Sequence, residues 1–393
     1  MKVIISGYYG FGNAGDEALL SGMLAALAAA APGAVDVTVL SADPEGTRRL
    51  HGVDAVGRQD LGPIWRALKG GTDLFISGGG GLLQDATSRR SALYYLGMIR
   101  LAHLAGVPVY LYGQGVGPIR SRSVRVAARR VLRRVAGAGA RDAASARLLA
   151  ALGADPRRVA VTADPAFALT PSDPAEQAAL LERFGIPLGR RPLLGIVWRR
   201  PLANGEAARG VVEAVAPFAR SIRAGVTVIT LQPGVDDREG DEFARALADA
   251  GVLFVHRPGG RLDHRSLRIL VEAMDMNVCV RYHGLLFSAL GGVPAVGLAY
   301  DEKVRHLAHT LKLPCFPFPV DAGAVRRSLQ ELWEKAGAVG ARLRQTVRTL
   351  RGRAMAEAAR CLACAKGGPV PETPAPGGPA SRGRAPEGTA PHA

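Results

Sequence analysis

Short, continuously apolar segments recur along this chain, and each ends in glycines or charged residues before a helix-like run. The segments are 2–6, 35–40, 74–77, 107–112, 193–198, 226–231, 252–255, a stretch ending at Val280, and 294–300. Strands that are apolar throughout are typical of parallel sheets covered by helices on both faces. The pattern predicts an α/β fold of two doubly wound, Rossmann-like domains that face each other across a cleft.

A proline-rich segment divides the pattern in two. At 393 residues the chain is long enough for two domains, each with its own core. We expect an N-terminal domain over 1–168, a linker over 169–192 and a C-terminal domain over 193–366 that ends in helices. The remaining residues, 367–393, are rich in Pro, Gly and Ala and cannot form a core, so we expect them to be disordered.

The net charge of +16 favours acidic partners, but the excess lies mostly in arginine, in a chain rich in Ala, Gly and Pro. Nucleic acid is not expected, because aromatic residues are only 5% and no DNA- or RNA-binding signature is present. One segment alternates arginines with apolar residues at helical spacing. Its arginines are Arg122, Arg125, Arg129, Arg130, Arg133 and Arg134. This segment is typical of an amphipathic surface helix, and docking on acidic lipid is the alternative.

The apolar run 18–31 resembles the core of a signal peptide. Asp16 and Glu17 precede it, where a signal peptide requires positive charge. We therefore expect a cytoplasmic protein, with any membrane contact peripheral at the inner face of the plasma membrane. Four cysteines are too few for a disulfide scaffold, and Cys361 and Cys364 lack a second ligand pair for a metal.

The most informative motif is Val280-Arg281-Tyr282-His283-Gly284. It places Arg281 and His283 between the end of a strand and the first turn of a helix, and Gly284 within that turn. A helix amino end offers unpaired N–H groups and partial positive charge, which suits an anion. Arg281 adds a planar fork of donors, and His283 adds a group that exchanges a proton near neutral pH.

Further cations follow two other strands of the second half. Lys303 comes after the strand 294–300, and Arg199 and Arg200 come after the strand 193–198. Their combined field should lower the pKa of His283 until an anionic ligand binds and restores it. The arrangement predicts a site for a small, highly charged donor that is protonated while it reacts.

The loop Gly10-Phe11-Gly12-Asn13-Ala14-Gly15 fits a dinucleotide-binding fingerprint, and Asp43 follows the next strand as a ribose ligand would. However, Asp16 and Glu17 occupy the helix start, where two carboxylates would repel a pyrophosphate. Capping of the helix is the simplest explanation of these two acids. We favour a carbohydrate instead, because Tyr8 and Asn13 also suit sugar hydroxyls.

Two more glycine-rich loops are expected to line the same crevice. Four consecutive glycines, Gly78 to Gly81, form either a tight turn or a close approach to a ligand. Gln84 and Asp85 follow them, and Gln114 lies between glycines after the next strand.

Together these motifs resemble the polysaccharide pyruvyl transferase family, over about residues 1 to 345. The matching motifs are 7–17, 78–81, 113–118, Ala163-Asp164-Pro165-Ala166 and Arg281-Tyr282-His283. The sequence is most similar to the CsaB type, which modifies secondary cell-wall polymers so that S-layer proteins can attach. The resemblance implies a GT-B-like fold, phosphoenolpyruvate as donor, and a pyruvate ketal on O4 and O6 of a lipid-linked N-acetylmannosamine.

The resemblance also implies roles for particular residues. The donor would be bound by Arg281, by Arg199 or Arg200, and by Lys303, next to Gly284, with His283 as the general acid. Asp16 or Glu17 would orient or deprotonate the acceptor. The remaining residues expected on the acceptor side are Tyr8, Gly12, Asn13, Gly15, Gly79, Gly80, Gln84, Asp85 and Gln114. This chemistry requires no metal or other cofactor.

A nucleotide-sugar glycosyltransferase of the same two-domain type is the alternative. Such enzymes usually bind the nucleoside through an acidic residue of the second domain, and the sequence offers no convincing equivalent.

Overall fold

The computed structural model describes residues 1–186, 189, 192–199, 206–260 and 262–365. The expected disordered tail lies outside the described residues, and so does Arg200.

The first half of the described chain forms an eight-stranded sheet in which every strand pair is parallel. Its order is β3-β2-β1-β4-β6-β7-β8, and β5 pairs with β6. The strands are β1 Lys2–Tyr9, β2 Asp36–Ser41, β3 Asp54–Gly57, β4 Leu74–Ser77, β5 Gly80–Leu83, β6 Val109–Val116, β7 Gly137–Ala140 and β8 Val159–Val161.

The second half forms a six-stranded sheet, again parallel throughout the described residues. Its order is β11-β10-β9-β12-β13-β14. The strands are β9 Leu193–Trp198, β10 Gly225–Thr230, β11 Val255–His256, β12 Met276–Cys279, β13 Ala295–Ala299 and β14 Cys315–Pro317. Strand order reverses between β1 and β4 and between β9 and β12, which is where doubly wound sheets bind ligands. The predicted α/β fold with two facing sheets is confirmed.

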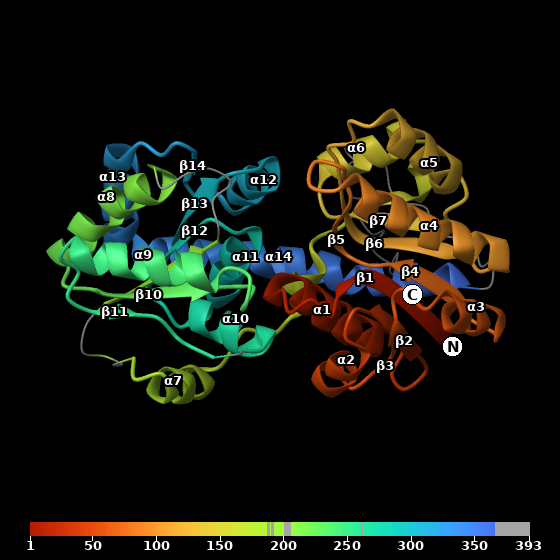
Figure 1. Ribbon diagram of the computed structural model, residues 1–393, viewed down its shortest axis with the longest axis horizontal. Helices are drawn as coiled ribbons and strands as arrows, with labels where there is room; N and C mark the ends of the chain where they lie inside the picture. Colours follow the sequence, from red (N-terminus) through yellow and green to blue (C-terminus); the bar gives the residue numbers. More distant parts are fainter. Residues whose placement is uncertain (187–188, 190–191, 200–205, 261, 366–393) are drawn as a thin grey trace, which may run out of the picture.

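Helices connect the strands and cover both sheets (Figure 1). They are α1 Ala14–Ala30, α2 Pro44–His51, α3 Leu61–Lys69, α4 Arg89–Ala105, α5 Arg122–Leu132, α6 Ala143–Ala151, α7 Pro174–Arg183, α8 Glu206–Ser221, α9 Asp237–Asp249, α10 His264–Glu272, α11 Tyr282–Gly291, α12 Glu302–Leu311, α13 Ala322–Glu334 and α14 Ala336–Ala363, with the 3-10 turns η1 Pro156–Arg158 and η2 Pro165–Ala168.

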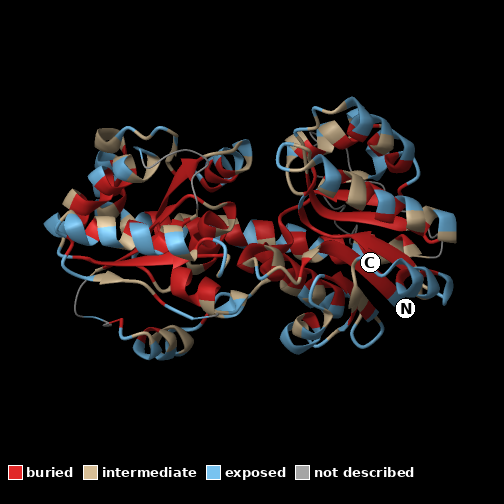
Figure 2. Ribbon diagram, viewed as in Figure 1, coloured by how far each residue is buried: buried red, intermediate tan, exposed pale blue. Residues whose placement is uncertain are grey.

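The two halves share one apolar core. Buried side chains of α1, β9, α11 and α14 belong to a single cluster, and a second cluster packs α3, α4 and α5 against the other face of the first sheet. Figure 2 shows the buried residues continuing through the contact between the halves. The halves therefore pack against each other through apolar surface as well as through the site.

Local structure departs from the sequence-based expectations at two places. Gly80 and Gly81 begin the short strand β5, where the sequence also allowed a tight turn into a helix, because β5 pairs with the carboxyl-terminal end of β6. The linker contains a regular helix, α7, which starts at a complete capping box formed by Asp173 and Glu176. The expected domain limits at 168 and 193 stay a prediction.

Helix α14 is attached to both halves. It packs against α11 and α13 on one side and against α1, η2 and β6 on the other, and it runs along both halves in Figure 1. Glu357 of α14 is fully buried, and its Oε1 accepts a hydrogen bond of 2.7 Å from the backbone N–H of Gly113. Burial raises the pKa of Glu357 to about 8. Protonated Glu357 therefore supports the carboxyl-terminal part of β6 at neutral pH.

We expect Glu357→Ala to lower the free energy of unfolding by about 2 to 4 kcal/mol, because it leaves a cavity and an unpaired buried N–H at Gly113. Glu357→Gln keeps the accepting oxygen without a charge and should cost less than about 1 kcal/mol at pH 7. Urea unfolding of both variants measures the difference. Equal losses in the two variants would contradict the role of this hydrogen bond.

Candidate active site

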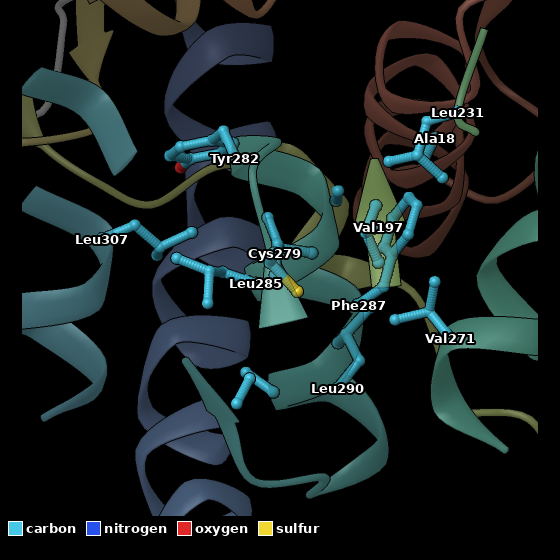
Figure 3. Close-up of a cluster of buried hydrophobic side chains, with 14 of the residues drawn as sticks. Ala18, Val197, Leu231, Val271, Cys279, Tyr282, Leu285, Phe287, Leu290 and Leu307 are labelled. Atoms are coloured by element: carbon cyan, nitrogen blue, oxygen red, sulfur yellow. The ribbon is translucent and has the colours of Figure 1, made fainter. Parts of the chain in front are cut away.

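The first turn of α11 forms one wall of the site. Strand β12 ends at Cys279, and the chain enters α11 with Arg281 at the N-cap position. Apolar side chains of α11, such as Leu285 and Phe287, fix the helix in the core (Figure 3). A side chain at Gly284 would overlap Val197 of β9, so glycine is needed where α11 crosses the sheet.

The first turn of α1 lies directly against the first turn of α11. The backbone N–H of Ala14 donates to the carbonyl of Leu231, in the other half of the chain, at 2.8 Å. A Cβ atom at Gly15 would overlap the imidazole ring of His283. The predicted acceptor-side loop and the predicted donor-side motif therefore meet, with Gly15 allowing the close approach.

His283 is almost enclosed by protein, and cations surround it. Burial lowers its pKa well below 6.5, and Arg141, Lys303 and Arg281 lower it further. The sequence predicted the direction of this shift from the nearby cations. In the structure burial is the larger cause, and Arg141 is an additional cation that was not among the predicted site residues.

Asp164 faces His283 from the first half. Its Oδ2 lies 4.0 Å from Nε2 of His283, and both atoms are buried without a hydrogen-bond partner among the described residues. Its other oxygen accepts from the N–H of Ala166, at the start of η2. Burial raises the pKa of Asp164 to about 6, against the opposing field of Arg141.

Arg141 connects Asp164 to the α11 motif. Its guanidinium lies over the ring of Tyr282, 4.7 Å from the ring centre, and its Nη1 is 3.9 Å from Asp164. These residues, with Lys303 and His306, line a small cavity of about 40 Å³. Arg141 was not predicted as a site residue because the preceding strand β7, Gly-Ala-Gly-Ala, has no recognisable pattern of large apolar residues.

Asp16, at the start of α1, belongs to the same group of charged residues around His283. Burial raises its pKa to about 7, while Lys303 and Arg281 oppose the shift and Glu17 adds to it. A carboxyl group with this pKa changes its protonation state near neutral pH. It can therefore serve as a proton acceptor at the site.

Arg281 is oriented by a carboxylate from the neighbouring strand loop. Its Nη2 donates to Asp236, which is buried after β10, while its buried Nε has no partner among the described residues. Asp236 was not among the predicted site residues, because a carboxylate in a proline- and glycine-containing loop gives no signal of its own. The pairing leaves part of the guanidinium available to a ligand.

Arg199 and Lys303 both lie against the ring of Tyr300. The Cζ atom of Arg199 is 4.2 Å from the ring centre, and Nζ of Lys303 is 5.8 Å away. Lys303 also pairs with Asp301 at 3.1 Å, and the buried Nε of Arg199 has no partner in the described part of the chain. The three strand ends of β9, β12 and β13 therefore bring Arg199, Arg281 and Lys303 to one side of the cleft.

Glu17 points to the other side of α1. Its Oε1 accepts from the N–H of Gly10 at 2.8 Å, and its Oε2 lies 2.8 Å from Nε2 of His51. The hydroxyl of Ser21 continues this chain to Nε2 of His264 at 2.8 Å. Both carboxylate oxygens of Glu17 are thus engaged in fixing the glycine loop and the contact between the halves.

The other predicted residues of the first loop differ in their surroundings. Tyr8 stacks on Phe11 with ring centres 4.1 Å apart, at the carboxyl end of β1. The side chain of Asn13 caps α1 by accepting from Gly15 N at 3.0 Å. Gly12 is exposed and has a φ of +68°, which glycine adopts without strain.

The glycine segment after β4 packs next to Asp16. A side chain at Gly79 would press on Pro165, and one at Gly80 would approach Leu19 and Asp16. Buried Gln114 donates to the carbonyl of Gly80 at 2.9 Å, so it supports this loop from behind.

Gln84 and Asp85 make local contacts in the following loop. Gln84 accepts from the N–H of Thr87, and Asp85 accepts from the N–H groups of Arg120 and Ser121 at 2.8 and 2.6 Å. Of the carboxylates that we predicted on the acceptor side, Asp16 is therefore the one that lies in the charged group around His283.

Among the described residues, no group of His, Cys, Asp and Glu has the arrangement of a metal site.

The raised pKa of Asp164 predicts a measurable pH dependence of stability. Its folded pKa of about 6 lies above its ordinary value of 3.8, so its ionisation destabilises the fold as the pH rises through 6. Asp164→Asn removes this ionisation. Between about pH 4 and pH 7, the unfolding free energy of the variant should therefore rise relative to wild type by about 2 kcal/mol.

Asp85→Asn is the matched control for this measurement by urea unfolding. Burial alone would raise the pKa of Asp85, but hydrogen bonds from the N–H groups of Arg120 and Ser121 lower it. The contribution of Asp85 to stability is therefore lost as the pH falls. The unfolding free energy of the control, relative to wild type, should change with pH in the opposite sense. A pH-independent difference between Asp164→Asn and wild type would contradict the assigned environment of Asp164.

Solved structures of several sugar-nucleotide enzymes share this fold. UDP-GlcNAc 2-epimerase from Neisseria meningitidis bound to UDP-GlcNAc superposes with a TM-score of 0.65 at 11% identity, covering 92% of this chain and 99% of that one. Anabaena HepE in complex with UDP-glucose gives 0.58 at 15% identity, with coverages of 93% and 97%. The heptosyltransferase II of E. coli gives 0.52 at 15% identity, with coverages of 86% and 100%. The chain is GT-B-like in fold.

No curated protein matches the sequence significantly. None of the helices in the described ranges is long and apolar enough to cross a bilayer.

The family model for polysaccharide pyruvyl transferases matches residues 13–302, which is more than half of the chain. This span contains the start of α1 with Asp16, Asp164, and the motif of Arg281 and His283. The chain therefore belongs to the polysaccharide pyruvyl transferase family, enzymes that transfer a pyruvyl group in polysaccharide synthesis.

Proposed function

We propose that this enzyme transfers the enolpyruvyl group of phosphoenolpyruvate to a sugar, forming a cyclic ketal of pyruvate on two hydroxyls. The acceptor we propose is a lipid-linked saccharide containing N-acetylmannosamine, modified at O4 and O6 for a secondary cell-wall polymer, as in the CsaB type. The observation that supports it best is the convergence of Arg199, Arg281 and Lys303 on the strand ends beside His283.

The charges of the donor fit this group of cations. Phosphoenolpyruvate carries a carboxylate and a phosphate, which planar guanidinium groups and an ammonium group bind well. The N-terminus of α11 adds N–H groups and positive potential at the same place. Burial and these charges hold the pKa of His283 well below its ordinary value, and a bound anion would raise it and allow His283 to carry a proton.

The proposed reaction begins with a proton that passes from His283 to the methylene carbon of the donor, which leaves positive charge at C2. One sugar hydroxyl adds to C2, the bond from C2 to the phosphate oxygen breaks, and the second hydroxyl closes the ketal. The reaction balances through the two hydroxyl protons. One restores the proton that His283 gave to the new methyl group, and the other leaves with phosphate.

We assign Asp16 as the group that orients the acceptor and takes a hydroxyl proton. Its pKa of about 7 suits this task near neutral pH, and it faces the donor cations from the first half of the chain. Glu17 is less suited, because both of its oxygens are already engaged with Gly10 and His51. The acceptor would lie along the loops that carry Tyr8, Gly12 and Gly80.

The function is tested by incubation with phosphoenolpyruvate and a panel of lipid-linked N-acetylhexosamines, with mass spectrometry of the product. We expect phosphate release together with the mass gain of a pyruvate ketal. A nucleotide-sugar transferase would instead release nucleoside diphosphate from a UDP-sugar, and that result would overturn the proposal.

His283→Ala should lower the rate of phosphate release by about 100-fold or more, because the general acid is lost. His309→Ala, an exposed histidine on α12, is the matched control and should keep wild-type activity. Circular dichroism and the unfolding midpoint check that both variants are folded. Activity of folded His283→Ala within a few-fold of wild type would remove His283 from the mechanism.

We further propose that the enzyme contacts an anionic membrane surface through the groove between α4 and α5. The groove has a cavity of about 500 Å³ with an apolar floor, and Arg100, Arg130 and Arg134 lie along it. Leu104 at its edge is 62% exposed. A basic rim around an apolar groove complements the headgroups and acyl chains of an acidic leaflet.

Replacing Arg100, Arg130 and Arg134 by Gln should weaken binding to vesicles containing phosphatidylglycerol on the order of 100-fold, at about 1 kcal/mol per basic residue. The control replaces Arg326, Arg327 and Arg348, three exposed arginines of α13 and α14, and should bind like wild type. Sedimentation with phosphatidylglycerol and with pure phosphatidylcholine vesicles measures both. Equal losses in the two triple variants would show a general charge effect and contradict the proposed surface.

A further inference from the structure

Arg58 is a cation at the edge of the cleft that neither the sequence motifs nor the proposed reaction uses. It directly follows β3, so it lies at the same carboxyl edge of the first sheet as Tyr8 and the glycine loop. Strand β2 separates β3 from β1, and the Arg58 side chain reaches past it to Phe11.

Aromatic rings fix the guanidinium of Arg58. Its Cζ atom lies 4.2 Å from the ring centre of Tyr94, 5.0 Å from that of Phe11 and 5.6 Å from that of Tyr95. Phe11 in turn stacks on Tyr8. Stacking of this kind orients a guanidinium while leaving its edge free for hydrogen bonds.

The backbone of Arg58 is fixed as well. Its N–H donates to the carbonyl of Ser41 at 2.8 Å, and its own carbonyl accepts from the hydroxyl of Tyr94 at 2.6 Å. No carboxylate in the described ranges pairs with the side chain, and its buried Nε has no hydrogen-bond partner there. An oriented guanidinium with unused donors is what a bound oxyanion requires.

Tyr8 links Arg58 to the first loop of the acceptor side. Phe11 stacks on Tyr8 and also lies against the guanidinium of Arg58, so Arg58 shares one aromatic cluster with a residue that we expect to contact the acceptor. The pKa of Tyr8 is raised by burial and by Asp16, and it is lowered by Arg58 and Arg281 among others. A charged group bound at Arg58 would therefore lie beside the acceptor-side loop.

We propose that Arg58, supported by Phe11 and Tyr94, forms a subsite for an oxyanion carried by the acceptor next to the sugar that is modified. This inference rests on the proposed function, because it assigns the acceptor to the first half of the chain. The oxyanion is a phosphate or a carboxylate, and bidentate recognition by a guanidinium suits both.

The test compares three derivatives of N-acetylmannosamine that carry an alkyl chain and differ in the group next to the sugar. The first has a diphosphate between the sugar and the alkyl chain, the second has a uronic acid as the next sugar, and the third is a neutral alkyl glycoside. Wild type should prefer at least one charged acceptor over the neutral one by about 10- to 100-fold in kcat/KM, the size expected for a charged hydrogen bond. The two charged acceptors distinguish phosphate from carboxylate as the source of the oxyanion.

Arg58→Gln should abolish this preference while the KM for phosphoenolpyruvate changes less than about two-fold. Arg58→Lys keeps the charge without the planar fork and should retain part of the preference. Arg66→Gln, an exposed arginine on α3, is the control and should behave as wild type. A preference that survives in Arg58→Gln, or an equal rise of the donor KM, would overturn the proposal.

Calorimetric titration of the same three compounds separates the subsite from the chemistry. If no acceptor is turned over but a charged compound binds wild type and not Arg58→Gln, the subsite stands and the proposed pyruvyl transfer fails. If transfer proceeds equally well to the charged and the neutral acceptors, the proposed function stands and the subsite fails. Absence of any difference in both measurements leaves Arg58 as a structural residue only.

Discussion

The close approach of two helix amino ends is the constraint on which the site depends. Helix α1 of the first half and α11 of the second half meet where Gly15 lies against His283, and the bond from Ala14 N to Leu231 O closes the contact. Both helices direct the positive potential of their amino ends toward the same space. Negative charge nearby stabilises such a junction. This accounts for the carboxyl groups that surround it, and it favours the binding of an anionic ligand at the same place.

Carboxyl groups lie at three different places in this junction. Asp236 orients Arg281, Asp164 lies between Arg141 and His283, and Asp16 stands at the start of α1. Burial raises the pKa of both Asp16 and Asp164 into the range of about 6 to 7, so each exchanges a proton under physiological conditions. A reaction that adds one proton to carbon and removes two from hydroxyl groups needs several such positions close together.

Strong local patterns in the sequence predicted the fold and pointed to the motif at the start of α11, whereas elements with weak patterns gave no usable prediction. Continuous apolar strands and the Arg281-Tyr282-His283 motif led directly to two parallel sheets and to one wall of the cleft. Arg141 was missed because β7 consists of glycine and alanine, and Arg58 because β3 is only four residues long. The partners of Glu17 could not be predicted either, because His51 and His264 reach it only through tertiary packing. Long-range contacts between short polar segments leave no periodic signal in a sequence.

The continuous helix α14 has a mechanical consequence for the two halves. It packs against α11 and α13 of the second half and against α1, η2 and β6 of the first, so a change in the angle between the halves would have to bend this helix or break its contacts on one side. Glu357 joins α14 to Gly113 of β6, and Gln114 of the same strand donates to the carbonyl of Gly80. The helix therefore stiffens the junction and links the position of the Gly80 segment to that of the second half.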